Sequence, residues 1–344
     1  MSFSFPHTKL LIFIVLIFIG CSSQDKEDAS NFFLKANQAL NQKNYAEAIR
    51  LYDEAIDKNS EFSDAYLNKG ICLMKLGRID DAYEILTKAI QIDQSLVQAI
   101  LVRSEAGILL GKLNESEADL KKIRKAYQDS SSYYLIHGNL MGSKNNISEA
   151  MADYDQSISL DSSNVEALVN RGAIQYKLGA LDLAFKDFTK AVKFNPSQSE
   201  ALNNLGLIAT KQRDWKTAIS YFDLILNSNP ADALALNNKG FVLLQINDLE
   251  NGRQLIERSL DLIPNNGYAL RNMGIYYKQK GNYTQALAEF NRAIELADIT
   301  EDLYGLTGQT YHMSGNKAEA CKIWKKGIVL KDSISKTEYH ANCQ

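Results

Sequence analysis

The chain repeats itself every 34 residues, without an insertion, over most of its length. A small residue recurs at the eighth place of each unit, at Ala36, Gly70, Ser104, Gly138, Gly172, Gly206, Gly240, Gly274 and Gly308. A second small residue recurs at the twentieth place, at Ala48, Ala82, Ser116, Ala150, Ala184, Ala218, Gly252, Ala286 and Ala320. Nine units fill residues 29–334, namely 29–62, 63–96, 97–130, 131–164, 165–198, 199–232, 233–266, 267–300 and 301–334. Fixed self-similarity at such a period predicts a repeat architecture.

Each unit is expected to form two helices joined by a turn. In the unit 267–300, Leu270, Met273 and Tyr277 recur at helical spacing and form one apolar stripe. The small residue at place 8 lets the two helix backbones approach closely. Gly281 follows the first helical pattern and suits the left-handed conformation that ends a helix. Since one helix pair cannot bury its own apolar face, neighbouring units must stack and share a core.

Large side chains complete the pattern and identify the family that it resembles. Place 24 holds Tyr52, Leu86, Leu120, Tyr154, Phe188, Phe222, Ile256, Phe290 and Trp324, and prolines recur at place 32, at Pro196, Pro230 and Pro264. With the small residues at places 8 and 20, this resembles the tetratricopeptide repeat. The resemblance implies an all-α fold, a right-handed α-solenoid (superhelix) of nine tandem 34-residue helix-turn-helix repeats. The third and ninth units depart most from the motif, and terminal repeats are commonly atypical.

The first 20 residues lie outside the repeats and read as a signal peptide. Lys9 precedes an unbroken apolar run at residues 10–19, followed by Gly20 and Cys21. Ten helical residues span roughly 15 Å, about half of the hydrocarbon core, so the pattern favours a secretory signal over a membrane-spanning helix. The Gly-Cys pair resembles a bacterial lipoprotein signal, which implies cleavage before Cys21 and its lipidation. Ordinary secretion and an uncleaved anchor remain alternatives.

Residues 21–28 are expected to form the lipidated Cys21 and a short polar tether. In lipoproteins of Gram-negative bacteria, Ser rather than Asp after the lipidated cysteine favours the outer membrane, and this chain has Ser22. The resemblance therefore implies a bacterial cell envelope protein, lipid-anchored at the outer membrane on its periplasmic or surface face. The acidic stretch that follows Ser22 also resembles surface-export signals of Bacteroidetes lipoproteins, although a solvated tether explains it equally well.

Composition and motifs give no indication of catalysis, cofactors or metal binding. The 38 Lys and Arg are interleaved with 41 Asp and Glu, so no basic cluster favours nucleic acid. The four histidines lie far apart, and no phosphate loop or nucleophile motif is present. The residues outside the nine units are too few for a catalytic domain, so we expect no enzyme activity, no cofactor and no metal.

The remaining cysteines have separate interpretations. Cys72 falls within a helical pattern and is expected to be a small buried apolar residue. Cys321 and Cys343 lie 22 residues apart, in the last repeat and in the C-terminal tail at residues 335–344. Outside the cytoplasm these two could pair and hold the tail over the end of the solenoid. Two unrelated thiols are the alternative.

The resemblance places the first helix of every pair on the concave face, where peptides bind. At place 6 the sequence has Asn170, Asn204, Asn238 and Asn272, one repeat apart, and Asn68 earlier in the chain. An amide offers a donor and an acceptor to a peptide backbone, and the row resembles the asparagine ladder of O-linked GlcNAc transferases. The predicted groove also includes Asn203, Asn237 and Arg271 at place 5 and Phe241 at place 9. A local structural role of these asparagines in the repeat is the alternative.

The sequence thus predicts a non-catalytic scaffold or adaptor that binds a protein or an extended peptide in its groove, in envelope complex assembly. A surface receptor component for peptide or polysaccharide, or a structural homo-oligomer, is the alternative. The carboxylate clamp of chaperone-binding repeats is matched in the first three units only by asparagines such as Asn37 and Asn68. Binding to a chaperone C-terminus is therefore not expected.

Overall fold

The fold is all-α. The computed structural model describes residues 8–296 and 301–343, with side chains from Gln24 onward, and its regular secondary structure in those ranges is helical. Two compact units divide the chain after Asn170. The first contains α1 (Thr8–Asn41), α2 (Tyr45–Lys58), α3 (Ser63–Lys75), α4 (Ile79–Ile92), α5 (Val97–Leu109), α6 (Leu113–Ile123), α7 (Ser131–Ser143) and α8 (Ile147–Leu160).

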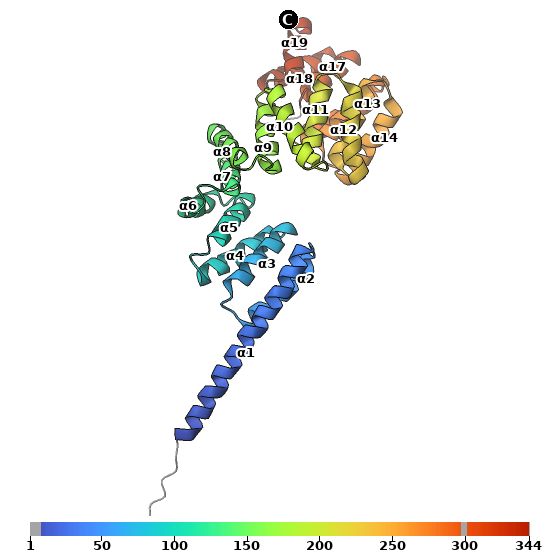
Figure 1. Ribbon diagram of the computed structural model, residues 1–344. Coiled ribbons are helices and arrows are strands. Elements are labelled where there is room, and N and C mark those ends of the chain that lie inside the picture. Colours follow the sequence, from blue (N-terminus) through green and yellow to red (C-terminus); the bar gives the residue numbers. More distant parts are fainter. Residues whose placement is uncertain (1–7, 297–300, 344) are drawn as a thin grey trace, which may run out of the picture. The chain divides into compact units, whose positions relative to one another are not determined.

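The second unit begins at Arg171, within α9 (Val165–Lys177). It continues with α10 (Leu181–Phe194), α11 (Ser199–Lys211), α12 (Trp215–Ser228), α13 (Ala233–Gln245), α14 (Leu249–Leu262), α15 (Gly267–Gln279), α16 (Tyr283–Glu295), α17 (Leu303–Met313), α18 (Lys317–Val329) and α19 (Ser333–Asn342). Within each unit, consecutive helices pack as antiparallel neighbours in a solenoid, as the coloured ribbon shows (Figure 1).

Every turn inside a helix pair uses one left-handed residue at the same place of the repeat. This fifteenth place has positive φ in all nine pairs, at Lys43, Gly77, Gly111, Asn145, Gly179, Arg213, Asn247, Gly281 and Gly315. A residue in this conformation ends a helix and satisfies its last carbonyls. At Gly281, for example, φ is 74° and the backbone N–H donates to the carbonyl of Lys278. The Gly281 turn predicted from the sequence is confirmed.

The core is built where the residue at place 8 meets the side chain at place 24. The place-24 side chains are almost completely buried, from Tyr52 at 0% exposed to Trp324 at 0%. A Cβ atom added to Gly274 would lie 2.4 Å from the ring of Phe290, and one added to Gly206 would lie 2.6 Å from Phe222. Glycine at 206 and 274 is therefore a steric requirement, because the ring occupies the volume that a side chain would need.

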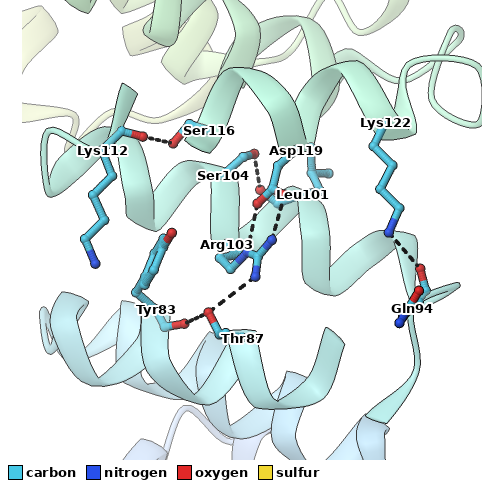
Figure 2. Close-up of polar contacts among 10 residues, drawn as sticks. All are labelled: Tyr83, Thr87, Gln94, Leu101, Arg103, Ser104, Lys112, Ser116, Asp119 and Lys122. Carbon is cyan, nitrogen blue, oxygen red and sulfur yellow. Dashed lines mark hydrogen bonds and ion pairs between the residues drawn. The ribbon is translucent and has the colours of Figure 1, made fainter. Parts of the chain in front are cut away.

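In the third repeat, polar side chains link α5 to both α6 and α4. Arg103 of α5 forms a bidentate ion pair with Asp119 of α6, with nitrogen–oxygen distances of 2.8 and 2.7 Å, and also donates to Thr87 of α4 (Figure 2). Buried Ser104 donates to the carbonyl of Leu101. These contacts tie three helices together where α6 has only 11 residues.

Helix α1 changes the interpretation of the N-terminal region. It continues without a break through residues 21–28, so the predicted tether is helical in the structure. Gln24 donates to Asp28, and Asp25 lies 3.7 Å from Lys58 of α2. The apolar run and Cys21 have no described side chains, so the predicted lipid site lies outside the described residues. Among the helices of the described part, none meets the length and apolarity that a membrane span requires.

The predicted C-terminal tail is instead a helix that covers the last repeat. Helix α19 packs on α17 and α18, and Ser335 is fully buried. Asp332 accepts hydrogen bonds from the backbone N–H groups of Gly305 and Ser335. Cys321 and Cys343 form a disulfide, which resolves the open alternative for these thiols. The tail expectation missed this helix because the polar pattern after residue 333 has no strong apolar stripe. Cys72 is buried, and burial raises its pKa to about 11.

Two glycines of α7 test the steric requirement within one helix. A Cβ at Gly138 would lie 2.7 Å from the Tyr154 ring, whereas at Gly142 the nearest atom is the Tyr154 hydroxyl at 3.9 Å. We expect Gly138→Ala to lower the free energy of unfolding by about 1–3 kcal/mol. Gly142→Ala should leave it unchanged or raise it by up to about 1 kcal/mol. Urea denaturation followed by circular dichroism measures both, and equal effects of the two substitutions would contradict the steric account.

Removal of the disulfide is expected to loosen α19 selectively. The bond closes a segment of 22 residues, and a loop of that length corresponds to about 3 kcal/mol of local stability. In Cys343→Ser, amide hydrogen exchange should accelerate in α19 and at its contacts on α17 and α18. Exchange in α3 and α4 serves as the internal control. Unchanged protection of α19 would show that packing alone holds it.

Candidate functional site

One hollow in the second unit collects polar and aromatic side chains from the first helices of successive pairs. Its volume is about 540 Å³, and its walls come from α9, α11, α13 and α15, from the turn and first residue of α12 (213–215), and from residues 301–302 before α17. We call it the C-terminal groove. Its lining residues are Tyr176, Asn203, Leu207, Thr210, Lys211, Arg213, Trp215, Leu234, Asn237, Asn238, Phe241, Tyr268, Arg271, Asn272, Glu301 and Asp302. A second hollow of about 570 Å³ shares Phe241, Arg271 and Asp302 with it.

Six of the nine residues predicted for the groove line this hollow. They are Asn203, Asn237, Asn238, Phe241, Arg271 and Asn272. Asn204 is not among the lining residues, and its amide donates to the carbonyl of Glu200 in its own helix. Asn68 and Asn170 belong to the first unit. The structure therefore brings together the place-5 residues with two members of the predicted ladder, while binding by any of them stays a prediction.

The amides of the groove form a directed relay of hydrogen bonds. Arg271 donates from Nε and Nη2 to Oδ1 of Asn272, at 3.2 and 3.0 Å. The relay continues from Asn272 to Asn237 at 2.9 Å, from Asn237 to Asn238 at 3.1 Å, and from Asn238 to Asn203 at 2.8 Å. Asn272 and Asn237 are only 1% and 2% exposed. Since aligned hydrogen bonds polarise one another, this relay holds α11, α13 and α15 in register.

The asparagines of the first unit have the same kind of role. Asn68 and Asn170 donate to Oδ1 of Asn37 and Asn139, at 2.9 and 2.8 Å. The same two acceptors receive the hydroxyls of Tyr52 and Tyr154. The place-6 amide thus bridges one repeat to the one before it. This is the structural alternative that the sequence left open, and it applies to every ladder member except Asn204.

Arg271 lies at the centre of the groove. Its guanidinium carbon is 5.4 Å from the ring centre of Phe241 and 5.5 Å from that of Tyr268, and Nη1 donates to the carbonyl of Glu301 at 2.9 Å. Burial lowers the pKa of Arg271, and the carboxylates of Glu301 and Asp302 oppose that shift. Burial also raises the pKa of Asp302. The cation thus lies within about 6 Å of two aromatic ring centres, a favourable arrangement for guanidinium.

Two residues that line the groove, Tyr176 and Trp215, were not among those predicted from the sequence. Tyr176 of α9 stacks under Lys211, whose Nζ is 5.0 Å from the ring centre. Burial raises the pKa of Tyr176, and the charge of Glu301 adds to this rise. Tyr176 is on α9, the first helix of its pair, which the family resemblance places on the concave face, so the signal was present. Trp215 begins α12, the second helix of its pair, and only the structure shows that it lines the groove.

Within the part of the chain that the structure describes, no group of three or more His, Cys, Asp or Glu side chains is arranged to hold a metal ion. The chemistry of the C-terminal groove is instead that of recognition. Its side chains offer hydrogen bonds, aromatic faces and three cations, Lys211, Arg213 and Arg271, beside two carboxylates, Glu301 and Asp302.

Comparison with known families gives a consistent result along the chain. Family models described as "Tetratricopeptide repeat" match residues 39–103, 165–198, 184–233 and 232–299, and one described as "TPR repeat" matches residues 138–179. Together these matches include the whole of α2 to α4 and of α8 to α16.

Individual relatives share only part of the chain. Sperm-associated antigen 1 of Rattus norvegicus is 34% identical over 97 residues, which are 28% of this chain and 11% of the relative. DnaJ homolog subfamily C member 7 of Homo sapiens is 34% identical over 91 residues, 25% of this chain and 18% of the relative. The chain therefore spans less than a fifth of either relative. The crystal structure of the APC/C hetero-tetramer Cut9-Hcn1 superposes with a TM-score of 0.67 at 18% identity, covering 87% of this chain and 59% of that chain. That likeness shows the fold alone.

The relay predicts different consequences for two asparagines at the same place of the repeat. Asn272→Ala removes a buried acceptor of Arg271 and a donor to Asn237, so we expect the free energy of unfolding to fall by about 1–3 kcal/mol. Asn204→Ala removes only a bond within its own helix, and the change should stay within about 0.5 kcal/mol. Urea denaturation of the two variants measures the difference. A loss at Asn204 as large as that at Asn272 would show that the relay does not stabilise the unit.

Proposed function

Since the chain belongs to the tetratricopeptide repeat family, we propose that it is a non-catalytic scaffold or adaptor for protein–protein interaction. In this proposal the C-terminal groove binds a protein or an extended peptide. The observation that carries it is the combination of exposed apolar and fixed polar groups in one hollow. Tyr268 and Leu234 are 49% and 57% exposed there, beside the amide relay and the Arg271 guanidinium.

Such a combination suits a peptide ligand. Exposed apolar side chains gain free energy when a partner covers them, and a few fixed polar groups set the orientation of the ligand. The groove is preorganised, because the relay and the aromatic stacking hold its walls before binding. A preorganised site loses little conformational entropy when the ligand arrives.

The proposed location is the bacterial cell envelope, with Cys21 as the lipid-bearing residue at the outer membrane and a role in envelope complex assembly. Two observations support it. The apolar run before Cys21 is typical of a lipoprotein signal. The disulfide between Cys321 and Cys343 suits an oxidising compartment, because disulfides are rare in the reducing cytosol. A mature lipoprotein carries several acyl chains, which make a lasting anchor where a single chain does not.

The test uses capture from a detergent-solubilised cell envelope with the full chain as bait. The groove variant Leu234→Ser/Tyr268→Ser removes two exposed side chains and leaves the buried relay intact. The matched control is Leu224→Ser on α12, because Leu224 is also 49% exposed but does not line the groove. We expect one partner to be retained by the wild type and by the control, and depleted about tenfold or more with the groove variant.

A synthetic peptide from the captured partner should then bind the wild type and fail to bind the groove variant. Equal capture by all three baits would contradict the proposal. Loss of the partner from the wild type after removal of the lipid would instead show that anchoring, rather than the groove, brings the two proteins together. Capture of a polysaccharide in place of a protein would favour the alternative of a surface receptor component.

A further inference from the structure

The Arg271 side chain lines the C-terminal groove and has hydrogen-bonding capacity that the described residues do not use. Arginine carries five N–H groups, and three of them donate in the structure, two to Asn272 and one to the carbonyl of Glu301. All three bonds go to neutral oxygens. Among the described residues, no carboxylate forms an ion pair with this guanidinium within 4.0 Å. Arg171 of the fifth repeat differs, since it pairs with Asp187 at 2.7 Å.

A guanidinium in such surroundings favours an anion. The guanidinium is buried beside the rings of Phe241 and Tyr268, and removing a charge from water is costly unless an opposite charge replaces the lost hydration. Two N–H groups of one arginine match the two oxygens of a carboxylate in a planar bidentate pair. Glu301 and Asp302 lie nearby, but Lys211 and Arg213 on the same groove add positive charge.

The groove also places an apolar site directly beside this cation. The ring centre of Tyr268 lies 5.5 Å from the guanidinium carbon, and Tyr268 is nevertheless 49% exposed. Leu234 on the preceding first helix is 57% exposed. A ligand that carries a carboxylate next to an aromatic or large aliphatic side chain would contact both features at once. Peptides offer that pair either at an apolar C-terminal residue or where an apolar residue neighbours Asp or Glu.

We propose that the C-terminal groove recognises a peptide carboxylate through Arg271, together with an adjacent apolar side chain on Tyr268 and Leu234. This inference rests on the proposed function, because it takes the groove as the ligand site. It differs from a clamp in the first repeats, which lack the required lysine and arginine residues. Here a single arginine in the eighth repeat is positioned by two aromatic rings and by the asparagine relay.

Two matched probes test the carboxylate. N-acetyl-phenylalanine carries the carboxylate and a ring, and N-acetyl-phenylalaninamide differs only in the neutral amide. The full chain in detergent is titrated with each probe, followed by saturation-transfer NMR and by the fluorescence of Trp215, which lines the groove. Fragments of this size should bind with a Kd on the order of 1 mM. We expect the acid to bind about tenfold more tightly than the amide.

Substitutions assign the preference to Arg271. Arg271→Gln should abolish the preference for the acid, and Arg271→Lys should retain only part of it because the planar fork is lost. The control Arg253→Gln removes an arginine of α14 that pairs with Glu250 and Glu257 outside the groove, and the preference should persist. Tyr268→Ser should weaken both probes. Since Tyr268 is exposed, this variant remains informative even if Arg271→Gln fails to fold.

Several results would overturn the proposal. Equal affinity of the acid and the amide would show that the groove does not recognise the carboxylate. The proposed function would still stand if Tyr268→Ser weakened the binding of both probes. A preference for the acid that survives in a folded Arg271→Gln variant would assign it to another cation. If neither probe bound, the carboxylate proposal would also be overturned. In that case the proposed function would still stand if capture of the partner depended on Leu234 and Tyr268. If glucuronic acid bound more tightly than N-acetyl-phenylalanine, the ligand of the groove would be an acidic sugar and not a peptide.

Discussion

The close approach of the two helices in each pair is the constraint on which the structure depends. A residue with little or no side chain at place 8 lets the first helix reach the buried side chain at place 24 of the second, as Gly274 does with Phe290. That contact leaves no space for a larger residue and fixes the crossing of the pair. Stacking then repeats the same geometry, so each first helix presents the same places to the next one. The recurrence of inward-facing side chains in the groove follows from this steric fact.

Polar contacts between repeats add the second level of order. The place-6 asparagines bridge neighbouring first helices, and ion pairs such as Arg103–Asp119 join the helices within a pair. Buried amides are costly unless they are satisfied, and here each satisfies the next. The groove therefore has rigid walls whose polar groups are already engaged. What remains available to a ligand is the set of groups that the repeat does not use, and Arg271 with its two aromatic neighbours is the clearest of these.

The ends of the chain differ from the repeats in the way that solenoids require. An internal repeat is covered on both sides, whereas the last one needs a cap. Helix α19 supplies this cap, with Ser335 buried and the disulfide between Cys321 and Cys343 holding the helix in place. At the other end, α1 continues beyond the first repeat through residues 21–28.

The period, the helix pairs, the left-handed turn at Gly281 and the all-α class could be predicted from the amino-acid sequence, because these follow from local spacing that is repeated along the chain. The family resemblance implied that the first helices line a groove, and six of the nine predicted groove residues meet in one hollow. What those residues do there is visible only in the folded structure. Asn237 and Asn272 are nearly buried and bonded to each other, since their partners come from the neighbouring repeat 35 residues away. Tyr176 and Trp215 line the same hollow as Arg271 because the repeats that contain them stack together. Contacts between repeats depend on how the helices stack, and spacing within one repeat does not encode that.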